Sequence, residues 1–171
     1  EAKQFSSILL NYLDKNEKYV DQNFHPSKSI RENNVIFDDS IKWIRLDEIN
    51  NAPLFKQDLI HPAFVKQGEI GNCFLVNCLS RFAMQPYIIP NFFEVDLPNQ
   101  ILGCVEDSVN IECGAVLIYF NCMGQKIPVL IDTLMPTKFG SLYCSYPLDD
   151  TKSAWFCLVE KAFAKLNGSF S

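Results

Sequence analysis

The chain has 171 residues, 48% hydrophobic and 20% charged, a length and composition typical of one globular domain with its own core. Its net charge of −5, without any basic cluster, argues against a nucleic-acid partner or an anionic membrane surface. No apolar stretch approaches the roughly 20 residues that cross a bilayer, and no signal peptide opens the chain. We therefore expect a cytoplasmic protein with no membrane span.

The first forty residues predict a short helix followed by an arm. Apolar side chains recur at helical spacing over residues 5–14, at Phe5, Ile8, Leu9, Tyr12 and Leu13. Residues 15–40 are polar and mixed, which indicates an ordered arm or a loop and not an independent domain. Residues 41–45 then alternate enough to predict a short strand.

Residues 67–75 carry the strongest chemical signal of the chain. Cys73 falls where a loop becomes an apolar helix, and Gln67 lies six residues upstream with glycines between them. The first turn of a helix favours negative charge, and so the thiolate form of a cysteine. A side-chain amide can donate hydrogen bonds to a developing oxyanion. The pattern predicts Cys73 as a nucleophile and Gln67 as the oxyanion donor; the alternatives are a buried core thiol and an ordinary loop glutamine.

The helix that follows Cys73 is predicted to be central and buried. Its apolar residues lie on most of its circumference; they are Leu75, Val76, Leu79, Phe82 and Ala83. Cys78, within the same helix, is accordingly predicted to be a core residue. Pro86 and Pro90 are expected to end the helix.

The second half of the chain predicts short strands and one long helix. Residues 114–121 and 126–132 indicate two strands joined by a hairpin at Gly124. A turn is expected at residues 136–140, followed by a strand over residues 141–146. A last helix is expected over residues 153–167, with Gly168 as its stop. Its apolar face comprises Trp155, Leu158, Val159, Ala162, Phe163 and Leu166.

The seven cysteines mostly lie in apolar runs; they are Cys73, Cys78, Cys104, Cys113, Cys122, Cys144 and Cys157. This pattern favours reduced, buried thiols of a cytosolic protein over a disulfide framework. With no CxxC pair, and with His25 and His61 far from most cysteines in the sequence, a structural zinc site is disfavoured. His61, beside Pro62, is predicted to be a surface loop residue, and a local Cys73–His61 pair is the lesser alternative.

Several motifs follow one another in the order of a known family. They are Trp43-x-Arg45-x-x-Glu48-Ile49, Gln67-Gly-x-x-Gly-x-Cys73, Val129-Leu130-Ile131-Asp132 with Pro136-Thr137-Lys138-x-Gly140, and the run from Ala154 to Gly168. Together they resemble the protease core of calpains, the cytosolic papain-like cysteine proteases, over roughly residues 40–170.

The resemblance implies an α+β fold, namely half of a papain-like core in which a central helix bearing Cys73 packs on helices and a few short antiparallel strands. It implies that residues 1–40 form an N-terminal helix and arm, and residues 41–171 the first subdomain. In calpains this half supplies the nucleophilic cysteine and the oxyanion glutamine, here Cys73 and Gln67, and a second subdomain supplies the histidine base and its orienting asparagine. A thiol without a base is a weak nucleophile, so the isolated chain is expected to be inactive toward protein substrates.

Three departures from the family pattern affect these expectations. Asn72 and Phe74 stand where the family usually has Asp and Trp, and Asn72 is expected to cap the helix as Asp would. Phe64 replaces an acidic calcium ligand, and Glu160 remains as the one candidate metal ligand. One carboxylate is a poor site for calcium, so Glu160 is alternatively expected to pair with Lys161 or Lys165. A non-catalytic, protein-binding calpain-like module is the competing function.

Overall fold

The computed structural model describes residues 11–12, 14–15, 17–25, 30, 40–49, 60–85, 88–89, 92, 104–105, 108–109, 114–147 and 154–170. Most of the helix predicted over residues 5–14 lies outside these, although residues 11, 12 and 14 are helical. Cys113 also lies outside the described residues. None of the described helices is long and apolar enough to cross a membrane.

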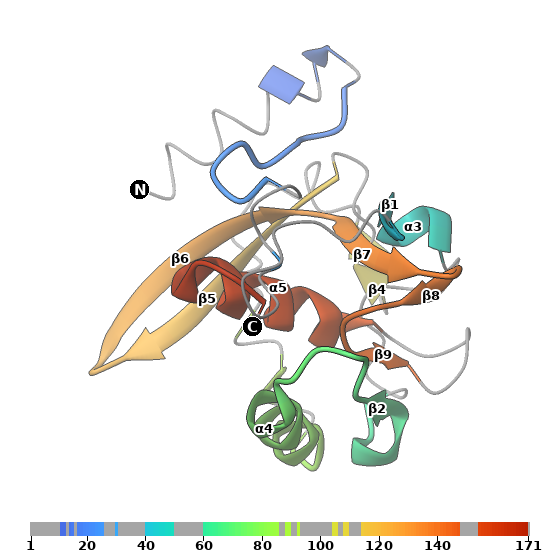
Figure 1. Cartoon of the computed structure of the whole chain (residues 1–171). Helices are drawn as coiled ribbons and strands as arrows, with labels where there is room; N and C mark the ends of the chain where they lie inside the picture. The colour runs from blue at the N-terminus through green and yellow to red at the C-terminus, as the bar shows by residue number, and fades with distance from the viewer. Residues whose placement is uncertain are drawn as a thin grey trace.

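The fold is α+β, with small antiparallel sheets arranged around a buried C-terminal helix, α5 (Figure 1). The strands in chain order are β1 (Ile41–Arg45), β2 (Val65–Lys66), β3 (Cys104–Val105), β4 (Ser108–Val109), β5 (Ala115–Cys122), β6 (Gln125–Asp132), β7 (Leu134–Lys138), β8 (Ser141–Leu142) and β9 (Tyr146–Pro147). The helices are α3 (Leu46–Ile49), the 3-10 helix η2 (Pro62–Phe64), α4 (Cys73–Ala83) and α5 (Trp155–Asn167). The sheets pair β1 with β7 and β7 with β8, β2 with β9, β3 with β4, and β5 with β6.

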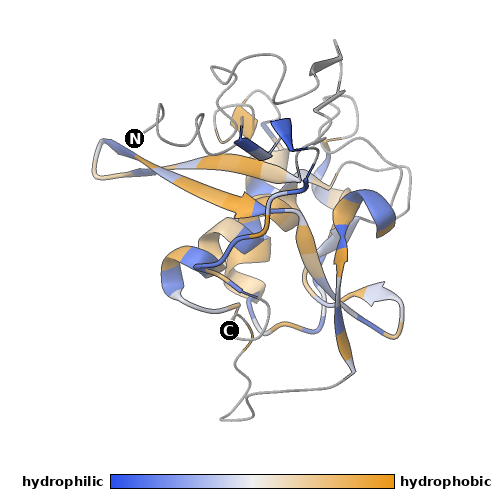
Figure 2. Cartoon of the chain, turned by 90° about the horizontal axis from the view of Figure 1, so that it is seen from above, coloured by the Kyte–Doolittle hydropathy of each residue, from blue (hydrophilic) through white to orange (hydrophobic). Residues whose placement is uncertain are grey.

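The predicted hairpin is confirmed, and each of its strands reaches one residue further toward the turn. Ala115 pairs with Asp132 at its base, and Cys122 pairs with Gln125 at its tip. Met123 and Gly124 both have positive φ angles, 50° and 80°, as the type I′ turn of a two-residue hairpin loop requires. Figure 2 shows hydrophobic residues along both strands and hydrophilic ones toward the tip, so the base of the hairpin is the part that contributes to the core.

The predictions for residues 134–147 were partly wrong. The turn expected at residues 136–140 is shorter, because β7 continues through Pro136, which lies opposite Trp43 of β1. Proline has no N–H to donate, but the carbonyl of Pro136 still accepts the N–H of Tyr143 at 2.8 Å. The strand expected over residues 141–146 is divided into β8 and β9, and the segment between them, residues 143–145, is buried.

Helix α5 forms the centre of the core. It ends at Gly168, whose φ of 88° gives the predicted left-handed stop. Trp155, Leu158, Val159 and Ala162 are buried as predicted, whereas Leu166 is exposed. The helix is covered on more than one face, since it also buries Glu160 and Lys161. Those two polar residues therefore need partners inside the protein.

Helix α4 is not the fully buried helix that was predicted. Leu75, Val76, Leu79 and Ala83 are buried, but the apolar residues Phe74 and Phe82 are exposed. Apolar residues around a helix predict burial only where neighbouring elements cover every side. In the described part of the chain, α4 packs with one face inward and exposes the other, on which apolar and polar residues are mixed.

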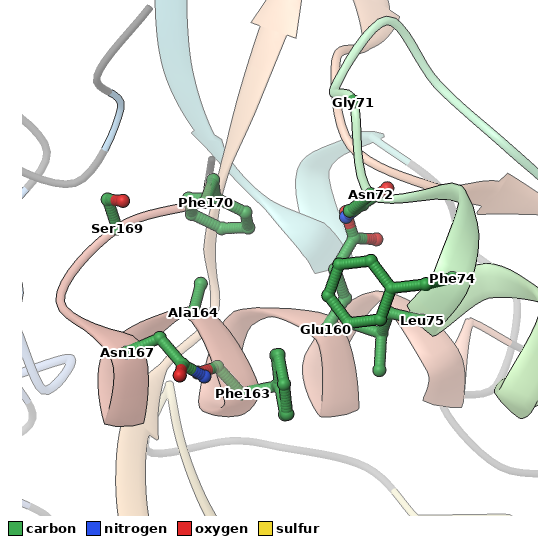
Figure 3. Close-up of a pocket in the computed structure, with 10 residues that line it drawn as sticks. All are labelled: Gly71, Asn72, Phe74, Leu75, Glu160, Phe163, Ala164, Asn167, Ser169 and Phe170. Atoms are coloured by element: carbon green, nitrogen blue, oxygen red, sulfur yellow. The ribbon is translucent and has the colours of Figure 1, made fainter.

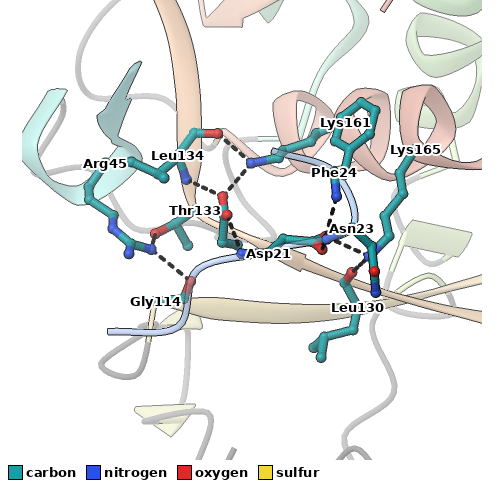
Figure 4. Close-up of polar contacts among 11 residues, drawn as sticks. Asp21, Asn23, Phe24, Arg45, Gly114, Leu130, Thr133, Leu134, Lys161 and Lys165 are labelled. Atoms are coloured by element: carbon teal, nitrogen blue, oxygen red, sulfur yellow. Dashed lines mark hydrogen bonds and ion pairs between the residues drawn. The ribbon is translucent and has the colours of Figure 1, made fainter. Parts of the chain in front are cut away.

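The arm over residues 17–25 is fastened to the core by buried charges (Figure 4). The Asp21 N–H donates to Asp132 at 2.7 Å, and Lys165 pairs with the Asp21 carboxylate at 2.5 Å. Lys161 pairs with the other oxygen of Asp132 and also donates to the carbonyl of Leu134 at 2.5 Å. This cluster of two ion pairs holds the arm, the end of β6 and α5 together.

Candidate active site

The loop from Gln67 to Asn72 lies directly against the backbone of residues 143–144. A Cβ atom at Gly68 would meet the carbonyl oxygen of Cys144 at 2.0 Å and that of Tyr143 at 2.3 Å. The N–H of Glu69 donates to the same Tyr143 carbonyl at 3.0 Å. A side chain at position 68 would therefore displace the loop, and glycine is required there for close approach.

Within this loop, the carbonyl of Ile70 connects Gln67 to Asn72, the residue that precedes Cys73. It accepts the side-chain Nε2 of Gln67 at 3.1 Å and the backbone N–H of Asn72 at 2.9 Å. Ile70 itself is buried, which fixes that carbonyl, while Gln67 is exposed. An amide carries two N–H donors, so one of the two on Gln67 remains for another acceptor.

Cys73 is the first residue of α4 and is exposed, in agreement with the expectation of a solvent-facing thiol. Its N–H is one of the first four of the helix, which have no acceptor within the helix. The local structure thus offers a thiol and a hydrogen-bond donor side by side; the nucleophile role stays a prediction.

The prediction for Cys78 is wrong, because this thiol is exposed on α4. Cys122 is exposed as well, whereas Cys144 and Cys157 are buried. A hydrogen bond with Cys157 and burial raise the pKa of the Cys144 thiol well above its ordinary value. The cysteines whose side chains the structure describes therefore divide into exposed thiols and a buried pair, and exposure alone does not single out Cys73.

The His61 side chain forms a hydrogen bond within its own loop. It precedes η2, and its Nδ1 accepts the N–H of Ala63 at 3.2 Å. Its ring lies 5.4 Å from that of Phe64. His61 is exposed, as predicted for a surface loop residue, and its Nδ1 lone pair already accepts a hydrogen bond from the loop.

Glu160 is buried beside the start of α4, with 1% of its surface exposed. One carboxylate oxygen accepts the Nδ2 of Asn72 at 2.5 Å. The other accepts the N–H of Ser145 at 2.8 Å and also the Ser145 hydroxyl. Burial raises the pKa of Glu160, and the hydrogen bonds from Ser145 and Asn72 oppose that rise.

This geometry corrects two expectations. Asn72 is the N-cap residue of α4, but its side chain makes no capping hydrogen bond and instead reaches across to Glu160. Glu160 does not pair with a neighbouring lysine, since Lys161 binds Asp132 and Lys165 binds Asp21. Sequence neighbours on α5 point to different sides of the helix, and the partners of Glu160 come from distant segments.

The surroundings of Glu160 do not fit a calcium ion. Calcium requires six to eight oxygen ligands, whereas both oxygens of Glu160 face N–H and O–H donors. Phe64 brings no side-chain oxygen. In the part of the chain that the structure describes, no group of three or more His, Cys, Asp or Glu residues could hold a metal ion.

A pocket of about 410 Å³ opens between the start of α4 and the end of α5. Figure 3 shows Asn72 and Phe74 on one side and Phe170 on the other, with Glu160 and Phe163 of α5 below. The rings of Phe74 and Phe163 lie 6.0 Å apart. Cys73 is not among the described lining residues, so this pocket lies beside the thiol and not at it.

Comparison with known proteins identifies the class to which this fold and site belong. The family model "Calpain family cysteine protease" matches residues 19–171, and the chain therefore belongs to the calpain family. It is 28% identical to Calpain-A of Drosophila melanogaster over 99% of this chain and 19% of that protein. It is 30% identical to Calpain clp-4 of Caenorhabditis elegans over 77% of this chain and 17% of that protein. The chain thus spans about a fifth of the length of the curated relatives it matches.

Sequence reasoning predicted Gln67 and Cys73 as site residues but missed the contacts that Asn72 and Ser145 make with Glu160. Both contact Glu160 across large sequence separations, 88 residues for Asn72 and 15 for Ser145. The available signal was chemical: a glutamate within a largely apolar helix needs buried donors. Nothing in the local pattern indicated which residues supply them.

Proposed function

We propose that this chain is the nucleophile-bearing half of a calpain-like intracellular cysteine endopeptidase, a hydrolase of protein substrates. The observation that carries the proposal is the exposed Cys73 at the first position of α4, preceded by a loop in which Gln67 is held through the Ile70 carbonyl. Membership of the calpain family supports the same chemistry.

In the proposed reaction, the Cys73 thiolate attacks the carbonyl carbon of a substrate peptide bond. The oxyanion that develops receives hydrogen bonds from the Cys73 N–H and from the second amide N–H of Gln67. The leaving amine takes a proton, and water then hydrolyses the acyl-enzyme. The proton transfers require a base, which the family resemblance assigns to a second subdomain.

The exposed face of α4 supports an arrangement in two halves. Phe74 has 59% of its surface exposed, Phe82 is exposed on the same helix, and so is Met84, the residue that follows the helix. Large apolar side chains gathered on one surface are typical of an interaction site. We therefore propose the second protease subdomain as the partner, and we expect residues 1–171 alone to show no protease activity.

A non-catalytic, protein-binding module is the second candidate function. It is favoured by the contact between Gln67 and the Ile70 carbonyl, because an oxyanion donor already engaged within its own loop is less available to substrate. Asn72 and Phe74, which depart from the usual family residues, add to this alternative.

Covalent labelling of the full-length protein by an epoxide thiol inhibitor tests the proposed function. We expect one labelled site, lost in Cys73→Ser and kept in Cys78→Ser, a matched control at an exposed thiol on the same helix. Gln67→Ala should lower kcat about 10²- to 10³-fold, as for loss of one oxyanion donor. A wild-type protein that is neither labelled nor active on an unstructured protein would establish the non-catalytic alternative.

A further inference from the structure

The start of α4 is held from outside the helix. Its N-cap residue, Asn72, has 6% of its surface exposed, makes no capping hydrogen bond and donates to Glu160. Glu160 is therefore hydrogen-bonded to Asn72, the residue immediately before Cys73. A shift of Asn72 would carry with it both the Cys73 thiol and the Cys73 N–H.

The same carboxylate also holds the surface against which the glutamine loop lies. Its second oxygen accepts the N–H and the hydroxyl of Ser145. The two residues before Ser145 support the loop: Tyr143 accepts the Glu69 N–H, and Cys144 leaves room only for glycine at position 68. Glu160 thus fixes one end of the Gln67–Cys73 loop directly and the other through the segment 143–145.

We infer that Glu160 is a positioning residue for the proposed peptide hydrolysis, acting through Asn72 and Ser145 to set the place of Cys73 relative to Gln67. The inference rests on the proposed function of Cys73 and deepens it. Glu160 does not touch the reacting atoms; it determines where they are. A displacement of about 1 Å in such a group can cost roughly a hundredfold in rate.

The chemistry of the three residues supports this role over simple packing. The described partners of Glu160 are neutral donors, and a carboxylate buried without a cation loses much of its solvation energy. Asparagine at position 72 suits this carboxylate, because an aspartate there would set two acceptors against each other. The Oδ1 of Asn72 is buried without a partner among the described residues, so that this amide could turn and accept a hydrogen bond instead.

An exchange of donor and acceptor tests the inference in the full-length protein. Asn72→Asp places a second carboxylate against Glu160 and should lower kcat about ten- to hundredfold, with KM nearly unchanged. Combining it with Glu160→Gln restores an amide–carboxylate pair in the opposite sense, and should bring kcat back to within about threefold of wild type. Glu160→Gln alone keeps the acceptor for Ser145 but obliges the Asn72 amide to turn its Oδ1 toward the new N–H, so its kcat should fall, though less than that of Asn72→Asp.

The controls separate positioning from stability and from the proposed function. Glu17→Gln, the same change at an exposed glutamate, should leave kcat, labelling of Cys73 by the epoxide inhibitor and Tm unchanged. A structural role alone would lower Tm and leave the kcat of folded protein unaltered. Wild-type kcat in folded Asn72→Asp, or no recovery in the double variant, would overturn the inference while Cys73→Ser still abolishes activity. Activity that survives Cys73→Ser would instead overturn the proposed function.

Discussion

Helix α5 carries two buried charged residues in succession, Glu160 and Lys161, and their partners differ in kind. Lys161 and its partner Asp132 belong to a cluster of two ion pairs, in which the Asp21 N–H links Asp132 to the second pair, Asp21 and Lys165 (Figure 4). Glu160, one residue earlier, faces only neutral donors among the described residues. The first arrangement neutralises charge inside the protein, and the second leaves a carboxylate to be stabilised by hydrogen bonds alone.

The difference shows what each side of the helix does. The charged cluster joins the N-terminal arm, the β6 end and α5, which are elements of the scaffold. Burial lowers the pKa of Lys161, and Asp132 opposes that shift. The Glu160 side contacts the loop that carries the candidate site, where neutral donors can be exchanged for others without leaving an unpaired cation.

The largest effect is expected from Asp132→Asn. The variant keeps the size of the side chain but leaves the buried Lys161 without a counter-charge and sets an amide against it. Breaking a buried ion pair in this way costs about 3–5 kcal/mol. Urea unfolding followed by tryptophan fluorescence should show this loss in the free energy of unfolding. A change below about 1 kcal/mol would show that the cluster is no more stabilising than a surface pair.

A smaller effect is expected from Lys165→Met in the same cluster. Methionine replaces much of the apolar stem, while Asp21 loses its cation but keeps the backbone N–H groups of Asn23 and Phe24. We expect a loss of about 1–3 kcal/mol, measured by the same unfolding experiment. Limited proteolysis should show faster cleavage within residues 17–25, since this pair holds the arm. Unchanged cleavage there would mean that other contacts hold the arm.

Glu160→Gln, the counterpart of Asp132→Asn on the other side of α5, should cost only about 1 kcal/mol. The glutamine carbonyl can still accept from Ser145, and Asn72 can turn its amide to accept the new N–H. The two isosteric variants, measured side by side by urea unfolding, therefore compare the two sites directly. Equal losses would contradict the distinction between an ion-paired and a hydrogen-bonded carboxylate.

The pH dependence of stability should separate wild type from the same Glu160→Gln variant by the smallest amount. Burial raises the pKa of Glu160 above its unfolded value, which is about 4.3. The folded state therefore binds the Glu160 proton more tightly than the unfolded state does. The stabilisation that protonated Glu160 contributes is fully present below the unfolded pKa and is lost as pH rises through the raised, folded pKa. The difference in unfolding free energy, wild type minus variant, should fall over this window. A difference independent of pH would show that Glu160 does not titrate in it.

Local patterns predicted those parts of the fold that depend on neighbouring residues. Gly124 between two strand-forming segments located the β5–β6 hairpin, and apolar periodicity with Gly168 located α5 and its end. The same reasoning failed at Pro136, where pairing with β1 outweighs the usual exclusion of proline from a strand. It failed also for α4, since the exposure of Phe82 and Cys78 depends on which elements cover the helix.

The candidate site was predictable to the same degree. Gln67 and Cys73 are close in sequence, and their spacing against a helix start is visible without a structure. The partners of Glu160 could not be predicted in this way. Lys161 and Lys165 lie near Glu160 in the sequence and suggested a local ion pair, but in the structure they bind Asp132 and Asp21. Long-range contacts of buried polar groups follow from the tertiary arrangement, which single-sequence patterns do not encode.

The turn at the tip of the β5–β6 hairpin provides a chemical probe of the native fold. Met123 is 100% exposed there, whereas Met135, in the middle strand of the β1–β7–β8 sheet, is 0% exposed. Dilute peroxide converts accessible methionines to sulfoxides, so mass spectrometry of treated protein should find Met123 oxidised while Met135 stays intact. Oxidation of Met135 would report opening of that sheet, which gives every variant above an internal check that requires no enzymatic activity.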